Sequence, residues 1–192
     1  VLTRTELESD DVGVADVLAE SSNATIADAV VPTIWPGVDL VPTSPGNESL
    51  AYVRDQLVVA GAGRERRLRD AIDVVRGVYD VILIDCQPSL GLLTVNALTA
   101  AHGVLIPLEC EFFALRGVAL LVETIDKVRD RLNPALELDG ILATMYDPRT
   151  LHAREVLERV VDTFGDPVFD TVSGRPVKLP AAQLAAKTGL ED

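Results

Sequence analysis

The chain has 192 residues, a length that suits one domain and is enough to bury a sizeable core. Hydrophobic residues make up 48% of it and charged residues 24%, which argues against a disordered, collagenous or repeat protein. The net charge of −13 excludes a protein whose whole surface attracts nucleic acid, so any affinity for DNA must come from a local basic patch.

The first half of the chain predicts helices more clearly than strands. Apolar periodicity favours a short helix at 14–18 and further helices at 25–31, 50–59 and 64–75. Prolines bound a predicted strand at 37–42.

The second half alternates strands with helices. Residues 79–85 place consecutive large aliphatic side chains between acids, which is typical of a strand buried on both faces. The alternation predicts an α/β fold with a doubly wound, mainly parallel sheet flanked by helices, in a single domain over 1–192. The remaining predicted elements are strands at 103–108, 140–145 and 168–172, and helices at 92–101, 115–132 and 152–164.

The two cysteines, Cys86 and Cys110, form no CxxC pair, which argues against a disulfide scaffold or a zinc ribbon. We expect Cys86 to be a buried packing thiol. Residues 1–6 lack the pattern of a signal peptide, and no stretch reaches the roughly 18 apolar residues of a membrane span. A reduced, cytoplasmic protein without a membrane partner is therefore expected.

Ligands of open α/β sheets lie beyond the carboxyl ends of the strands. Asp85 ends an apolar strand, as in the Walker B arrangement, where a carboxylate reaches a Mg²⁺-bound water beside nucleotide phosphates. Spacing alone leaves a plain turn role open for Asp85. The same rule selects the loop at 146–150, where Arg149 leads into a basic helix. Glu155 and Glu158 allow ordinary helix-surface ion pairs there instead of a DNA patch.

Four segments together carry a resemblance to a known family. Residues 81–101, with Asp85-Cys86-Gln87-Pro88-Ser89 at their centre, and residues 104–117, 140–150 and 169–172 closely resemble the ParA/Soj partition ATPases. The resemblance covers about 25–180 and leaves 181–192 as an atypical tail. It implies the deviant-Walker type of P-loop NTPase fold.

The resemblance also implies a function. Members of this family form homodimers with ATP between the subunits, bind DNA without sequence preference and segregate chromosomes or plasmids with a centromere-binding ParB-type partner. By this resemblance Asp85 would be catalytic, acting on Mg²⁺ through water, and Arg175 would lie near the nucleotide. Arg149 and Lys178 would contact DNA phosphate, and the protein would be associated with the nucleoid.

A phosphate-binding loop needs glycines followed by Lys and Ser or Thr, and no Gly-Lys dipeptide occurs in these residues. In the family that loop precedes the matched region, and after Lys178 this chain departs from the family pattern. We therefore expect a fold truncated at both ends that binds ATP and Mg²⁺ poorly, and hydrolysis stays an open question. The alternatives are a non-catalytic ParA-like scaffold or adaptor, or a relative that positions cargo other than DNA.

Overall fold

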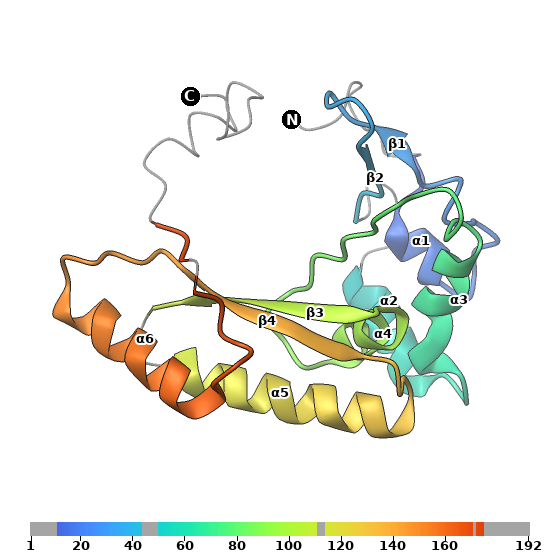
Figure 1. Cartoon of the computed structure of the whole chain (residues 1–192). Coiled ribbons are helices and arrows are strands. Elements are labelled where there is room, and N and C mark those ends of the chain that lie inside the picture. The colour runs from blue at the N-terminus through green and yellow to red at the C-terminus, as the bar shows by residue number, and fades with distance from the viewer. Residues whose placement is uncertain (1–10, 44–49, 111–113, 171, 175–192) are drawn as a thin grey trace. The chain divides into compact units, whose positions relative to one another are not determined.

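The computed structural model describes residues 11–43, 50–110, 114–170 and 172–174. They form two compact units, one ending at Ala100 and the other beginning at Ala101 (Figure 1). The prediction of a single domain stays a prediction.

The first unit is a cluster of short helices. Its helices are α1 (Val14–Leu18), α2 (Leu50–Val59), α3 (Arg67–Asp73) and α4 (Leu92–Ala100), with the 3₁₀ turn η1 (Arg64–Arg66) before α3. The strands β1 (Val31–Pro32) and β2 (Asp39–Leu40) form a small antiparallel pair. The helices pack small and aliphatic side chains against one another in a core that includes Ala15, Leu18, Val53, Leu57, Leu68, Ile72 and Ala97.

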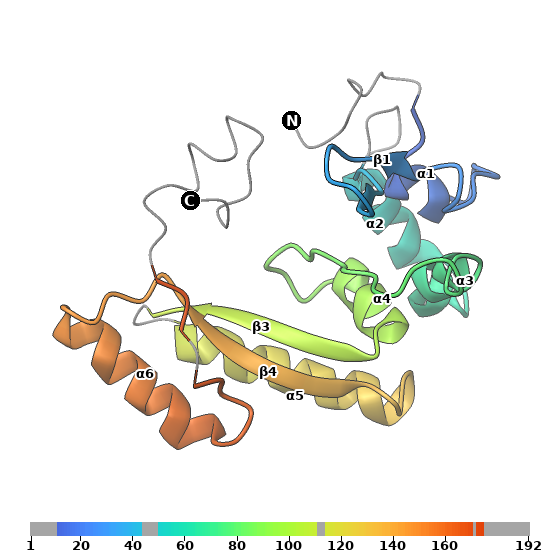
Figure 2. The same cartoon turned by 45° about the horizontal axis from the view of Figure 1, so that its top comes forward.

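The second unit is built from a strand, a helix, a parallel strand and a second helix. They are β3 (Gly103–Glu109), α5 (Ala114–Arg131), β4 (Glu137–Thr144) and α6 (Leu151–Phe164). The parallel register runs from Gly103 opposite Glu137 to Glu109 opposite Thr144. Figures 1 and 2 show α5 and α6 on the same side of the two strands. These elements confirm the predicted α/β class.

The chain after α6 runs alongside β4 and widens this sheet. Ile141 N–H donates to Pro167 C=O at 2.7 Å, and Phe169 N–H donates to Ile141 C=O at 3.0 Å. Further along, Ser173 N–H donates to Ala143 C=O at 2.7 Å. Parallel bridges join Ile141 to Val168 and Tyr146 to Gly174, so the predicted strand at 168–172 forms bridges to β4 and no continuous ladder within the described residues.

The second unit buries one face of its sheet. In β3, the buried residues Ile106 and Leu108 alternate with the exposed residues Leu105, Pro107 and Glu109. This alternation is that of a strand covered on one side. The buried residues of the helices, Val118, Ile125 and Val128 in α5 and Ala153, Val156 and Val160 in α6, recur at helical spacing.

The predicted strand at 79–85 is wrong as an element. Residues 81–87 lie outside any strand, and the exposed fractions of Val81 and Leu83 are 71% and 91%. A β-strand is held by hydrogen bonds to a neighbouring strand. No strand among the described residues pairs with this segment, so its apolar pattern alone does not produce one.

Two predictions near the start of the chain also need correction. The expected helix at 25–31 is a turn at 26–29, in which Thr25 N–H donates to the Asp28 carboxylate at 2.8 Å. Pro32 has no N–H to donate, and its ring clashes with the carbonyl four residues earlier, so the turn does not continue as a helix. The expected strand at 37–42 is paired only at Asp39–Leu40.

Glycine at position 140 is required by a close aromatic neighbour. A Cβ there would lie 2.6 Å from two ring atoms of Phe169. We expect Gly140→Ala to lower the free energy of unfolding by about 1 kcal/mol, because the ring must move. A Cβ added at Gly117, in α5, would meet open space. Gly117→Ala should therefore raise the free energy of unfolding by about 0.5–1 kcal/mol. Urea denaturation measures both; equal effects of the two variants would contradict the steric argument.

Candidate functional site

Asp85 lies on the surface of the first unit. It follows the exposed residues 81–83 and is itself exposed, so its carboxylate is accessible to a ligand. The turn after it is closed by Ser89 N–H, which donates to Gln87 C=O at 2.7 Å, and by Thr94 Oγ1, which donates to Ser89 C=O. These bonds tie the segment that carries Asp85 to the first turn of α4.

Helix α4 is fixed by the carboxamide of Asn96, which is completely buried. Its Nδ2 donates to Arg64 C=O at 2.9 Å and to Leu92 C=O at 3.0 Å. Its Oδ1 accepts from Leu68 N–H at 3.2 Å. One side chain thereby satisfies backbone groups of η1, α3 and α4, and it holds in place the helix on which the Asp85 segment rests.

The chemistry of Asp85 fits a Mg²⁺ ion that arrives with a nucleotide. Within residues 11–43, 50–110, 114–170 and 172–174, no group of three or more His, Cys, Asp or Glu could hold a metal ion. Mg²⁺ in phosphoryl-transfer sites is commonly bound by one or two carboxylates together with water and substrate phosphates. A single accessible carboxylate is therefore compatible with a Mg²⁺ site that nucleotide phosphates and water complete. It is not enough for a site formed by protein side chains alone.

Cys86 is exposed, so the expected buried thiol is wrong. The error arises because the strand predicted at 79–85, which Cys86 directly follows, does not form. Its Sγ lies 3.8 Å from the Ile84 carbonyl oxygen, to which the thiol donates. Partial desolvation of the sulfur, and secondly the charge of Asp85, raise the pKa of Cys86 above its usual 9.0.

We expect Cys86 to be alkylated more slowly by iodoacetamide at about pH 8 than a free cysteine, because only the thiolate reacts. The rate should rise with pH beyond the usual thiol pKa. Asp85→Asn removes the smaller of the two causes and should speed the reaction by about twofold. Mass spectrometry distinguishes Cys86 from the buried Cys110. A rate equal to that of free cysteine would contradict the raised pKa.

The loop between β4 and α6 presents Arg149 at the carboxyl end of a parallel strand. Met145 has a positive φ of 54° at the start of this loop. Thr150 N–H donates to Asp147 C=O at 3.1 Å, which closes a turn through Pro148. Thr150 Oγ1 then accepts from Ala153 N–H at 3.3 Å as the N-cap of α6. The backbone of the loop is thus defined on both sides of Arg149.

Arg149 is held by the carboxylate two residues before it. Its Nε donates to Asp147 Oδ1 at 2.9 Å and its Nη2 donates to Oδ2 at 2.7 Å. The Asp147 hydrogen bond, and secondly its charge, raise the pKa of Arg149, so the guanidinium stays charged. The Arg149 side chain is nevertheless 87% exposed, and Asp147 is 30% exposed.

The predicted site residues fall into three groups. Asp85 belongs to the first unit and Arg149 to the second. Arg175 and Lys178 lie outside the described residues.

Asp147 was not singled out from the sequence. The Asp-Pro-Arg sequence could have indicated the role of Asp147. In turns, an Asp side chain commonly accepts a hydrogen bond from the backbone N–H two residues later.

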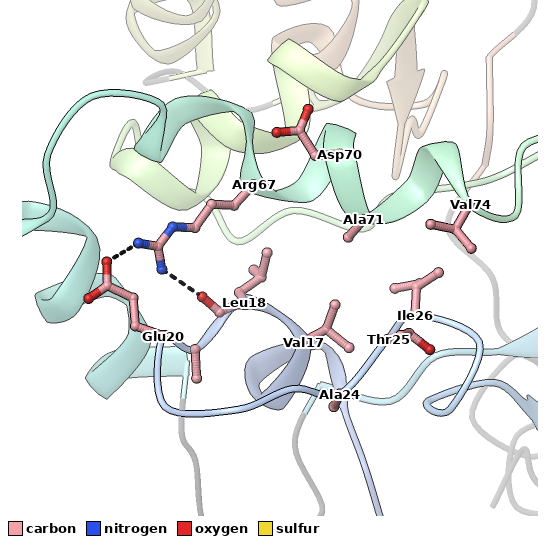
Figure 3. Close-up of a pocket in the computed structure, with 11 residues that line it drawn as sticks. Val17, Leu18, Glu20, Ala24, Thr25, Ile26, Arg67, Asp70, Ala71 and Val74 are labelled. Atoms are coloured by element: carbon pink, nitrogen blue, oxygen red, sulfur yellow. Dashed lines mark hydrogen bonds and ion pairs between the residues drawn. The ribbon is translucent and has the colours of Figure 1, made fainter.

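A second feature was not predicted at all. The first unit has an open cavity of about 400 Å³ between α3 and the segment 17–26. Figure 3 shows Arg67 at one end, bound to the Glu20 carboxylate and donating to Leu18 C=O at 3.0 Å. Spacing cannot reveal this pair, because the partners are 47 residues apart. The Arg67 guanidinium is thus engaged by protein groups, which favours a structural role for it.

No helix within the part of the chain that the structure describes is long and apolar enough to cross a membrane.

Comparison with known proteins identifies the family. A family model described as an AAA domain matches residues 2–138. ParA, the chromosome partitioning protein of Caulobacter vibrioides, is 46% identical over 166 residues, which are 85% of this chain and 61% of ParA. The chromosome-partitioning ATPase Soj of Treponema pallidum is 52% identical over 119 residues, 62% of this chain and 47% of Soj. The chain belongs to the ParA/Soj family.

Two further similar proteins extend the comparison. An uncharacterized protein of Mycobacterium tuberculosis is 51% identical over 177 residues, 92% of this chain and 54% of that protein. A Mycobacterium smegmatis structure described as cobyrinic acid a,c-diamide synthase, with an ATP analog and magnesium, has a TM-score of 0.78 at 40% identity. The match covers 90% of this chain and 68% of that one. The chain spans about half to three fifths of the length of the curated relatives named here.

Proposed function

We propose that this ParA/Soj chain acts in the partitioning of chromosomes or plasmids, as a homodimer that depends on ATP and binds DNA without sequence preference. The observation that carries the proposal is the 46% identity to ParA of Caulobacter vibrioides over 85% of this chain. That stretch includes most of the described residues, and with them the loops that present Asp85 and Arg149.

Asp85 is the group proposed to act on the nucleotide. Its carboxylate would hold a water molecule of the Mg²⁺ that accompanies the triphosphate. The magnesium, when bound, would neutralise charge on the phosphates during hydrolysis. Asp85's own part is to orient that water, and Arg175 would lie near the base. The exposure of Asp85 and the Mg²⁺ and ATP analog in the Mycobacterium smegmatis structure support this assignment.

Arg149 and Lys178 are proposed to contact the DNA backbone. Arginine and lysine that neutralise phosphate give binding that is independent of sequence and sensitive to salt. Because the chain carries a net charge of −13, such contacts must come from a restricted basic surface. The exposed guanidinium of Arg149 at the end of β4 supports the choice of that edge of the sheet. A centromere-binding ParB-type protein is the proposed partner.

Titration with a fluorescent ATP analogue, with and without Mg²⁺, tests the nucleotide site, while light scattering follows dimer formation. We expect weak, Mg²⁺-dependent binding, with a dissociation constant on the order of 1 mM, because no phosphate-binding loop occurs in these residues. Asp85→Asn should weaken Mg²⁺-dependent binding about tenfold.

Asp80→Asn is the matched control. It removes another exposed carboxylate, five residues before Asp85, and should leave binding unchanged. Equal binding by wild type and Asp85→Asn would contradict the role of Asp85. The absence of Mg²⁺-dependent binding in the wild-type chain would favour a scaffold without nucleotide chemistry.

A further inference from the structure

The Asp147–Arg149 pair has the geometry of a guanidinium bound to an oxyanion. Both carboxylate oxygens of Asp147 accept from the Arg149 side chain, at 2.9 and 2.7 Å. Bidentate pairing of this kind is equally suited to carboxylate and to phosphate. Asp147 therefore occupies one edge of the guanidinium, formed by Nε and Nη2, at which a DNA phosphate could also bind.

The pair is held together by the fold of the loop and is more than a chance surface contact. Arg149 N–H also donates to Asp147 Oδ1, at 3.0 Å, so backbone and side chain of Arg149 converge on one carboxylate. The turn closed by Thr150 and the start of α6 fix the backbone on either side. With its two members in one turn, the pair forms at little cost in chain entropy.

Charge is the second consequence of this arrangement. While Asp147 is bound, the loop contributes no net positive charge to an approaching phosphate. Because the Arg149 side chain is 87% exposed, water weakens the attraction between the members of the pair, and another oxyanion can replace the carboxylate. The loop thus carries both a group that can bind phosphate, Arg149, and a carboxylate that competes with phosphate for this group, Asp147.

We propose that Asp147 competes with the DNA backbone for Arg149 and so limits the affinity and the salt dependence of DNA binding. This inference rests on the proposed DNA contact of Arg149. Asp147 is a positioning residue in this scheme: it contacts no DNA, and it weakens binding by holding the guanidinium.

The test is the affinity for a random-sequence DNA duplex, measured with ATP and Mg²⁺ present by fluorescence anisotropy over a range of salt concentrations. Asp147→Asn keeps an oxygen that can accept from Arg149 N–H but replaces the other carboxylate oxygen by an amide NH₂. We expect this variant to bind DNA about fivefold more tightly at about 50 mM salt and to steepen the salt dependence by about one unit of slope. Its thermal unfolding midpoint should stay within about 2 °C of wild type.

Two further variants separate competition from a general charge effect. Glu155→Gln neutralises an exposed carboxylate early in α6 and leaves the pair intact, so its affinity should change less than twofold. Combining Asp147→Asn with Arg149→Ala should abolish the gain, because no guanidinium remains to be released.

The outcomes also distinguish this inference from the proposed function. If Arg149→Ala weakens DNA binding but Asp147→Asn does not strengthen it, competition is overturned and the DNA contact stands. An equal gain in Glu155→Gln, or a gain that persists without Arg149, overturns competition as well. If Arg149→Ala binds like wild type, the DNA contact of Arg149 fails, and competition fails with it.

Discussion

Replacing Asn96 by leucine should lower the free energy of unfolding by about 3 kcal/mol, because it leaves buried backbone groups without partners. Leu68 N–H and Arg64 C=O both bind the Asn96 carboxamide. The site is completely buried, so water cannot replace the lost bonds without opening the core. Leucine has the same branching and a somewhat larger volume, so no cavity is left, and overpacking adds to the loss. Urea denaturation followed by circular dichroism measures the change.

Thr99→Val is the matched control in the same helix. Thr99 is also buried, at 1% exposure, but its Oγ1 donates only to Val95 C=O within α4, at 2.7 Å. That carbonyl lies inside the helix, where the backbone also binds it, so we expect a loss of less than about 1 kcal/mol. If the two variants lost equal stability, burial alone would explain Asn96, and its role in joining η1, α3 and α4 would be wrong.

Reversing the charge of Arg149 and Lys178 together should weaken binding to random-sequence DNA about 100-fold at about 50 mM salt. Each substitution removes an attractive charge and adds a repulsive one beside the phosphate backbone. The slope of log affinity against log salt should fall by about one to two units, since the Lys178 contact is lost together with an Arg149 contact that Asp147 already limits. Fluorescence anisotropy over a series of salt concentrations gives both quantities.

Arg129→Glu with Arg131→Glu changes the net charge by the same amount at a different place. Both residues lie at the end of α5, from which the chain returns to the start of β4, so they are at the amino-terminal edge of the sheet in the second unit (Figure 1). We expect this control to weaken binding by less than about threefold. Equal losses in the two double variants would mean that overall charge governs binding, and the patch at Arg149 would be rejected.

Helices and the β3–β4 pair were predictable because their signals are local. The helix predicted at 115–132 is Ala114–Arg131, and the one predicted at 50–59 is Leu50–Val59. Their apolar residues recur at helical spacing, and glycine, proline or asparagine stands near their ends. The strand predicted at 103–108 is Gly103–Glu109 for a similar reason: its apolar run lies between a glycine and acidic residues.

The segment at 79–85 shows what local signals cannot supply. Its residues favour a buried strand, yet a strand forms only where another strand pairs with it, and that is a property of distant residues. The exposure of Leu83 and Cys86 follows from the missing pairing. The Glu20–Arg67 pair was unpredictable for the same reason, whereas Asp147 and Arg149 are close enough in sequence for a turn to have suggested their contact.

Binding of the wild-type chain to two unrelated DNA duplexes, with ATP and Mg²⁺ present and at about 50 mM and about 200 mM salt, tests the central claim most directly. We predict equal affinity for the two sequences and a loss of at least about tenfold at the higher salt, as expected for binding through phosphate contacts. No binding at the lower salt, or an affinity that does not respond to salt, would contradict the account of this chain as a DNA-binding partition protein.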